Sequence, residues 1–213
     1  MLNVEFFHDV ICSFCFPFSY RFRKYCEQFD DLNITHHSFS LIWTEDDFVQ
    51  KFGSRKKAKE AILTHWEHAN QNDDLHRFNI QAMKDADFEF PTSRNGLLAA
   101  KAVSLAFGEE HYWDMFDCIQ KALFVDTKNI DSLDVLENCV KEIGLDTKKW
   151  RQQFEQAQTL QSVEEDLKLL STYNIEVSPT LLVNKKHYLC GALSTVQLTE
   201  RFEELRKFYE NQD

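Results

Sequence analysis

The order of hydrophobic and polar positions divides the chain into two strand-containing ends and a helical middle. Residues 2–8 are short, apolar and aromatic, which predicts a buried strand. From Cys12 to about Asp30 the apolar residues recur every three or four positions, which is typical of a helix face. Residues 33–42 alternate in polarity and predict a second strand. Because a helix connects the two strands, we expect them to be parallel.

The middle of the chain, from about Asp46 to Tyr173, has only helical periodicity. Helices are expected over residues 55–71, 94–107, 110–123 and 132–143, around Trp150 and Phe154, and then up to Tyr173. The strand pattern returns in residues 175–184 and 186–191, which predict a hairpin before a final amphipathic helix. The expected order is β-α-β, a helical insertion, then α-β-β-α. We predict an α/β domain formed by residues 1–45 and 157–213, interrupted by a helical insertion domain at 46–156.

Composition and charge narrow the classes of function. The chain has 213 residues with a formal net charge of −11, so it lacks the positive charge that binding to nucleic acid requires, and no nucleic-acid partner is expected. No stretch approaches the roughly 20 apolar residues of a membrane span, so no membrane partner is expected. Polar and acidic residues interrupt the apolar ones near the first residue, unlike a signal peptide. A cytoplasmic location with six reduced cysteines is the expectation.

The candidate catalytic residues lie where the first predicted strand meets the first predicted helix, in the motif Cys12-Ser13-Phe14-Cys15. A thiol at a helix N-terminus faces free backbone N–H groups and the positive end of the helix dipole. Both favour the thiolate, so Cys12 is predicted to be the nucleophile. Cys15 lies one helical turn later and can attack a mixed disulfide formed on Cys12. No second CxxC or histidine pair follows at zinc-finger spacing, so structural zinc is not expected.

A second element is Ser178-Pro179-Thr180, directly before an apolar strand. Proline cannot donate to a sheet ladder, so Pro179 should lie where that strand begins. A cis Ser178–Pro179 bond would bring the Ser178 backbone beside the two sulfurs. The alternative is an ordinary trans proline at a strand edge.

These features together resemble the DsbA-like thioredoxin-fold family, and within it the cytosolic FrnE-type branch. The matching segments are FFHDVICSFC, TSRNGLLAAKAV and EVSPTLLVN, so the resemblance spans nearly the whole chain. It implies a thioredoxin-like fold with a large helical insertion, and thiol–disulfide oxidoreductase or isomerase activity. It also implies that Cys12 attacks, that Cys15 resolves and that Pro179 is the cis-proline.

The residues between the two cysteines differ from that branch, which usually has proline and tryptophan there. Such residues tune reduction potential, so the direction of the reaction stays open. Phe14 is a candidate for an apolar substrate-docking patch. Ser13 either hydrogen-bonds a thiolate or merely tolerates the first helical turn. Asp9, just before the motif, is a possible helper in proton transfer from Cys15, and strand alternation predicts that at most one of His8 and Asp9 faces the buried side beneath the thiols.

The other cysteines are interpreted as packing. Cys118 and Cys139 lie in apolar helix patterns, Cys26 lies too far along its helix to pair with Cys15, and Cys190 is the one that could approach the motif. His65 and His68 are three positions apart with His76 nearby, a spacing that could bind a metal, but no carboxylate–histidine grouping of recognised spacing completes a site, so no metal is expected.

The predicted activity is disulfide exchange on a disulfide-containing protein or small thiol substrate, with a cellular thiol as reductant. It needs no metal, flavin or nicotinamide cofactor, because the cysteine pair holds the electrons. The protein is expected to be a monomer or homodimer. One alternative is a glutathione-dependent isomerase or transferase resembling the kappa-class and hydroxychromene-carboxylate enzymes, which have serine where Cys12 stands. The other is a redox-sensitive adaptor protein without enzymatic activity.

Overall fold

A four-stranded sheet forms the centre of the molecule in the computed structural model, which describes residues 1–211. Its strands are β1 (Leu2–His8), β2 (Leu32–Ser38), β3 (Thr180–Val183) and β4 (His187–Cys190). They lie in the order β2-β1-β3-β4. The β1 and β2 strands are parallel, as predicted, and β3 is antiparallel to both of its neighbours. Two segments far apart in the sequence, β1 and β3, are therefore adjacent in the sheet.

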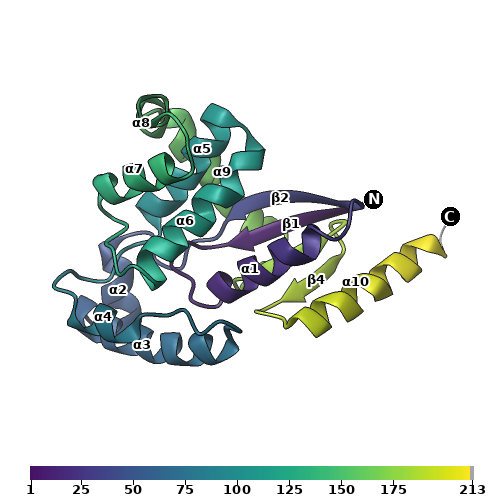
Figure 1. Ribbon diagram of the computed structural model, residues 1–213, viewed down its shortest axis with the longest axis horizontal. Coiled ribbons are helices and arrows are strands. Elements are labelled where there is room, and N and C mark those ends of the chain that lie inside the picture. The colour runs from purple at the N-terminus through teal and green to yellow at the C-terminus, as the bar shows by residue number, and fades with distance from the viewer. Residues whose placement is uncertain (212–213) are drawn as a thin grey trace.

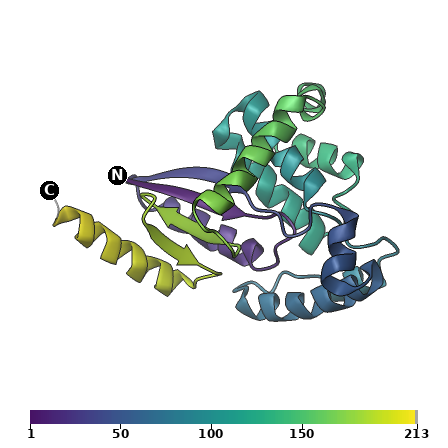
Figure 2. The same ribbon diagram turned by 180° about the vertical axis from the view of Figure 1, so that it is seen from behind.

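Helices cover both faces of this sheet (Figures 1 and 2). On one face α1 (Cys15–Cys26) and α10 (Thr195–Glu210) pack together, and on the other α9 (Ala157–Thr172) crosses behind β2. Successive residues of a strand point to opposite faces. Accordingly, the ring of Phe6 packs against Phe18 and Phe22 of α1, whereas Phe7 packs against Tyr173 beyond α9. This two-sided burial explains why Phe6 and Phe7, at successive positions of β1, are both apolar.

The remaining helices lie between β2 and α9 in the chain and surround a separate apolar core. They are α2 (Glu45–Phe52), α3 (Arg55–Asn72), α4 (Ile80–Asp85), α5 (Arg94–Phe107), a 3₁₀ turn (Glu109–His111), α6 (Tyr112–Phe124), α7 (Leu133–Glu142) and α8 (Thr147–Phe154). Helix α5 is the central one, because it contacts α6, α7, α8 and α9. The predicted helical middle is confirmed, while the domain limits 46–156 stay a prediction.

Helix α5 approaches the end of β1 closely at Gly96. A Cβ atom built at Gly96 would lie 2.7 Å from Cγ2 of Val10, a distance that real Cβ contacts do not show. The absence of a side chain therefore allows α5 to pack directly against the loop that precedes the cysteine motif.

Several predicted boundaries were wrong. Helix α1 begins at Cys15 rather than Cys12, because residues before it form tight turns in which Cys12 N–H donates to the Asp9 carbonyl and Cys15 N–H to the Cys12 carbonyl. Strand β2 ends at Ser38 rather than at residue 42, and β3 begins at Thr180. The short helices α2 and α4 were not predicted. None of the helices in the described part of the chain is long and apolar enough to cross a membrane.

Candidate active site

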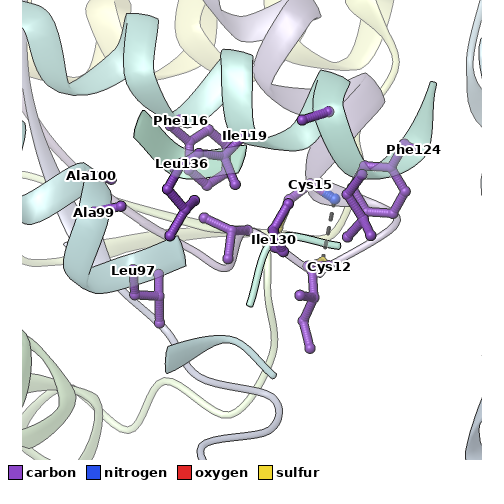
Figure 3. Packing of buried hydrophobic residues seen from close by; sticks show 14 of the residues in the cluster. Cys12, Cys15, Leu97, Ala99, Ala100, Phe116, Ile119, Phe124, Ile130 and Leu136 are labelled. Carbon is purple, nitrogen blue, oxygen red and sulfur yellow. Dashed lines mark hydrogen bonds between the residues drawn. The ribbon is translucent and has the colours of Figure 1, made fainter. Parts of the chain in front are cut away.

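The two cysteines of the motif lie together at the end of β1, below the surface. Cys12 is 4% exposed in the turn, and Cys15 is fully buried as the first residue of α1. The Cys15 backbone N–H donates a hydrogen bond to Cys12 Sγ at 3.3 Å, drawn as a dashed line in Figure 3. The same N–H also donates to the Cys12 carbonyl at 3.0 Å, so it is shared between the carbonyl oxygen and the sulfur of Cys12.

Ser178 faces both sulfur atoms from the loop before β3. The Ser178–Pro179 peptide bond is cis. The Cys12 thiol donates to the Ser178 carbonyl at 3.4 Å, and Cys15 Sγ and Ser178 Oγ are 3.1 Å apart, within hydrogen-bond distance. The backbone contact was expected from the sequence, whereas the contact of the Ser178 hydroxyl with the second sulfur was not.

The environment of the two thiols separates their roles. Burial raises the pKa of the Cys15 thiol well above its usual range, and the neighbouring Cys12 raises it further. The hydrogen bond with Ser178 acts in the opposite direction and favours the Cys15 thiolate. The Cys15 thiol therefore keeps its proton at neutral pH, and the Ser178 hydroxyl lies within hydrogen-bond distance of its sulfur.

Asp9 holds the loop of the motif in place. One of its carboxylate oxygens accepts from the Ile11 N–H at 3.0 Å, and the other accepts from the Leu41 N–H and the Ser93 hydroxyl, both at 2.6 Å. Burial raises the pKa of Asp9 to about 6, against the opposing effect of these hydrogen bonds. Both carboxylate oxygens bind the loop and its neighbours, so the geometry favours positioning of the motif. The helper role in proton transfer stays a prediction.

His8 and Asp9 are both fully buried, and their side chains meet different neighbours. The expectation that at most one of them faces the buried side beneath the thiols stays a prediction. His8 Nε2 lies 3.0 Å from Nδ1 of His36 on β2. Burial and the neighbouring His36 and Lys101 keep the pKa of His8 well below its usual value, so this histidine is neutral at pH 7.

A cavity of about 280 Å³ opens beside Cys12. Its walls come from the motif, from the loop after β2 and from the helical segment. They are predominantly apolar and include Ile11, Phe14, Leu41, Phe52, Trp66 and Phe90. Ser13, Ser178, Lys51 and His65 also line it. The sulfur of Cys12 is thus reached from an apolar recess, which the partly buried ring of Phe14 helps to form.

The fold and this site agree with a known family. The family model for the DSBA-like thioredoxin domain matches residues 3–203, which is most of the chain and includes both cysteines and Pro179. The chain belongs to the DSBA-like thioredoxin domain family. Its predicted α/β fold, a thioredoxin-like sheet with a large helical insertion, is thereby confirmed.

Solved structures resemble this DSBA-like protein over nearly its whole length. A candidate protein disulfide isomerase from Nitrosomonas europaea has a TM-score of 0.76 at 15% identity, covering 97% of this chain and 98% of that one. The cytosolic disulfide reductase DsbM from Pseudomonas aeruginosa, with GSH, has a TM-score of 0.71 at 18% identity, covering 99% and 98%. A 2-hydroxychromene-2-carboxylate isomerase has a TM-score of 0.67 at 13% identity, covering 99% of each chain. A search of curated proteins found no match.

The other cysteines of the DSBA-like chain differ in their surroundings. Burial raises the pKa of Cys26 to about 12, and Cys139 is buried, as expected for packing residues. Cys118 is only partly buried and Cys190 is exposed, so the packing interpretation was wrong for Cys190. Cys190 lies opposite Thr180 in the β3–β4 ladder, next to the Pro179 loop. Among residues 1–211, no three His, Cys, Asp or Glu side chains cluster as metal ligands would.

Removing the Ser178 hydroxyl is expected to slow the resolving step. In Ser178→Ala the Cys15 thiolate loses the hydrogen bond that favours it, which should slow attack on a mixed disulfide roughly tenfold. Single-turnover kinetics of the Cys12 mixed disulfide, followed by acid quench, measure that step. Ser178→Thr keeps a hydroxyl and serves as the control. Equal rates in Ser178→Ala and the wild type would contradict this role.

Asp9 should also make stability depend on pH. Its folded-state pKa of about 6 lies above the unfolded value near 3.8, so the folded protein binds the extra proton between these two values. The stability that Asp9 contributes therefore falls as the pH rises from about 4 to 6. Urea denaturation should show that Asp9→Ala lowers the free energy of unfolding by about 2 kcal/mol more at pH 4.5 than at pH 7.5. A cost that is independent of pH, or larger at pH 7.5, would contradict the raised pKa.

Proposed function

We propose that this protein is a thiol–disulfide oxidoreductase that acts through Cys12 and Cys15. The observation that supports this most strongly is the convergence of both sulfurs on Ser178, whose carbonyl is 3.4 Å from Cys12 Sγ and whose hydroxyl is 3.1 Å from Cys15 Sγ. The apolar cavity beside Cys12 offers space for the group attached to the substrate sulfur.

The proposed cycle begins with a substrate disulfide R–S–S–R′ in that cavity. The Cys12 thiolate attacks one sulfur, forming a Cys12–S–S–R mixed disulfide and releasing R′S⁻. The Cys15 N–H that points at Cys12 Sγ stabilises the thiolate before attack. In the mixed disulfide, the Ser178 carbonyl, freed from the Cys12 thiol, is available to a backbone N–H of a peptide substrate.

Resolution then requires Cys15 to lose its proton, which the released R′S⁻ takes up as R′SH. With the Ser178 hydroxyl donating to it, the Cys15 thiolate attacks Cys12 Sγ and expels RS⁻. The protein is left with a Cys12–Cys15 disulfide, and the two electrons have passed to the substrate sulfurs. A cellular thiol reduces this disulfide and completes the cycle, so the proposed direction is reduction or isomerisation of substrate disulfides in a cytoplasmic setting.

Trapping the intermediate tests the proposal. Cys15→Ser removes the resolving thiol, so incubation with oxidised insulin should accumulate a covalent Cys12–insulin complex that dithiothreitol releases. Mass spectrometry of the linked peptides identifies the cysteine involved. The double variant Cys12→Ser, Cys15→Ser is the control and should form no such complex at this motif. Failure of Cys15→Ser to trap insulin or another disulfide peptide, or trapping at Cys190 instead, would overturn the proposal.

The same variants separate the two alternatives. A redox-sensitive adaptor would retain its partner in a Cys12→Ala, Cys15→Ala chain and would show no insulin reduction in the wild type. A glutathione-dependent isomerase of the hydroxychromene-carboxylate type needs no resolving thiol, so it would remain active in Cys15→Ser.

A further inference from the structure

A second pair of thiols lies in the helical segment, away from the motif. Cys118 on α6 and Cys139 on α7 are 21 positions apart in the sequence, and Cys118 Sγ lies 3.8 Å from the Cys139 carbonyl oxygen. Helices α6 and α7 pack side by side, so this contact joins two neighbouring elements (Figure 1). Both residues are free cysteines in the structure.

The surroundings of the two thiols are unequal. Cys118 is partly exposed and its Sγ lies 3.7 Å from the Glu142 carboxylate, whereas Cys139 is only 2% exposed. The neighbouring Cys118 thiol holds the pKa of Cys139 below its usual range, with Lys128 and Lys121 acting in the same direction and burial and Glu142 opposing them. The neighbouring Cys139 and burial raise the pKa of the Cys118 thiol. The pair therefore combines one accessible sulfur with one buried, more acidic sulfur.

We propose that Cys118 and Cys139 form a second redox-active dithiol, which a small disulfide RSSR oxidises to an intramolecular disulfide. Cys118 is the entry point because it is the accessible sulfur, and Cys139 resolves the intermediate because it is in contact but shielded. This proposal does not depend on the activity of Cys12 and Cys15.

The reaction begins when the Cys118 thiol loses its proton to solvent. The Cys118 thiolate attacks RSSR, giving a Cys118–S–S–R mixed disulfide and RS⁻. Cys139 then loses its own proton, which the released RS⁻ takes up as RSH. The Cys139 thiolate attacks Cys118 Sγ and expels the second RS⁻. The two protein sulfurs are oxidised by two electrons, and RSSR is reduced.

Helix α6 also connects this pair to the active site. Asp117, next to Cys118, accepts hydrogen bonds from Ser19 and Arg23 of α1. Gln120, two residues further on, donates to the carbonyl of Asp9 at 3.4 Å. A covalent link between Cys118 and α7 would therefore restrain the helix that supports both α1 and the Asp9 loop.

Oxidised glutathione is the probe for the experiment, and the tested protein is the full chain with Cys12→Ser and Cys15→Ser. After incubation, free thiols are alkylated and the digested chain is analysed by mass spectrometry. The expected result is a peptide linked through Cys118 and Cys139 in most molecules. Adding Cys139→Ser should leave the glutathione adduct on Cys118. Adding Cys118→Ser should leave Cys139 at least tenfold less modified, because it is shielded.

Exposed Cys190 is the internal reference, since its glutathione adduct shows that the oxidant has reacted. Recovery of Cys118 and Cys139 as separate alkylated thiols while Cys190 has its adduct would overturn the proposal. A stable glutathione adduct on Cys118 with Cys139 present would overturn it as well. Circular dichroism of each variant confirms that the helices are intact, and the Cys12→Ser, Cys15→Ser chain keeps both tested thiols native.

Discussion

Replacing Cys12 with serine is expected to lower the rate of insulin reduction roughly a thousandfold or more, because a serine hydroxyl is not an effective nucleophile at neutral pH. The position of Cys12 explains the size of the effect. Its sulfur receives the Cys15 N–H, contacts the Ser178 carbonyl and borders the apolar cavity. No other described thiol has this combination of contacts. Turbidity of reduced insulin, with glutathione as reductant, measures the rate.

Cys26→Ser is the matched control for this experiment. Cys26 lies on the same helix as Cys15, and burial raises the pKa of its thiol to about 12, so it is a poor nucleophile. Its replacement removes one thiol and should leave the rate within about twofold of the wild type. Similar rates in Cys12→Ser and Cys26→Ser would rule out Cys12 as the attacking residue.

Replacing Lys101 with methionine is expected to destabilise the fold by about 3 kcal/mol, because it leaves a buried carboxylate without its cation. Lys101 on α5 is almost buried and its Nζ lies 2.7 Å from Asp166 on α9. Asp166 also binds Nδ1 of His37 and the backbone N–H of Ser38, both on β2. This network joins the helical segment to the sheet, and urea denaturation measures its loss.

The effect of Lys101→Met should depend on pH. Burial alone would raise the pKa of Asp166, but the hydrogen bond with His37 and the charge of Lys101 outweigh it and hold that pKa below its usual range. A lowered folded-state pKa contributes stability that is present above the unfolded value near 4 and is lost as the pH falls. The difference in the free energy of unfolding between Lys101→Met and the wild type should therefore be largest above pH 5 and decrease towards pH 3.

Lys128→Met is the control for this second prediction. Lys128 is 43% exposed and its Nζ lies 3.8 Å from Asp126, an ion pair in contact with solvent. Exposed pairs contribute little, so this variant should change the free energy of unfolding by less than about 0.5 kcal/mol. If both lysine variants lowered the free energy of unfolding by the same amount, the buried network would not be the source of the stability.

The elements that were predicted correctly have strong local signals. Residues 2–8 form a strand as expected, because the apolar side chains of β1 are buried on both faces, although Asn3 and Glu5 stand between them. Helices such as α5 and α7 have regular apolar stripes that end at glycine. The boundaries that were missed depend on distant groups. Strand β2 ends early because the Leu41 N–H binds Asp9, 32 positions away, and this contact leaves no trace in local periodicity.

For the proposed site, the amino-acid sequence alone singled out Cys12, Cys15 and Pro179 by their spacing and order along the chain, and their roles stay a prediction. Only the tertiary structure brought the Ser178 hydroxyl to Cys15, bound Asp9 to Ser93 from 84 positions away, and paired Cys118 with Cys139 across two helices. The physical reason is that a periodicity reports which face of an element is buried, but not which neighbour that face meets. The partners of a buried polar group or thiol are decided by how helices and strands cross, and that information is distributed over the whole packed chain.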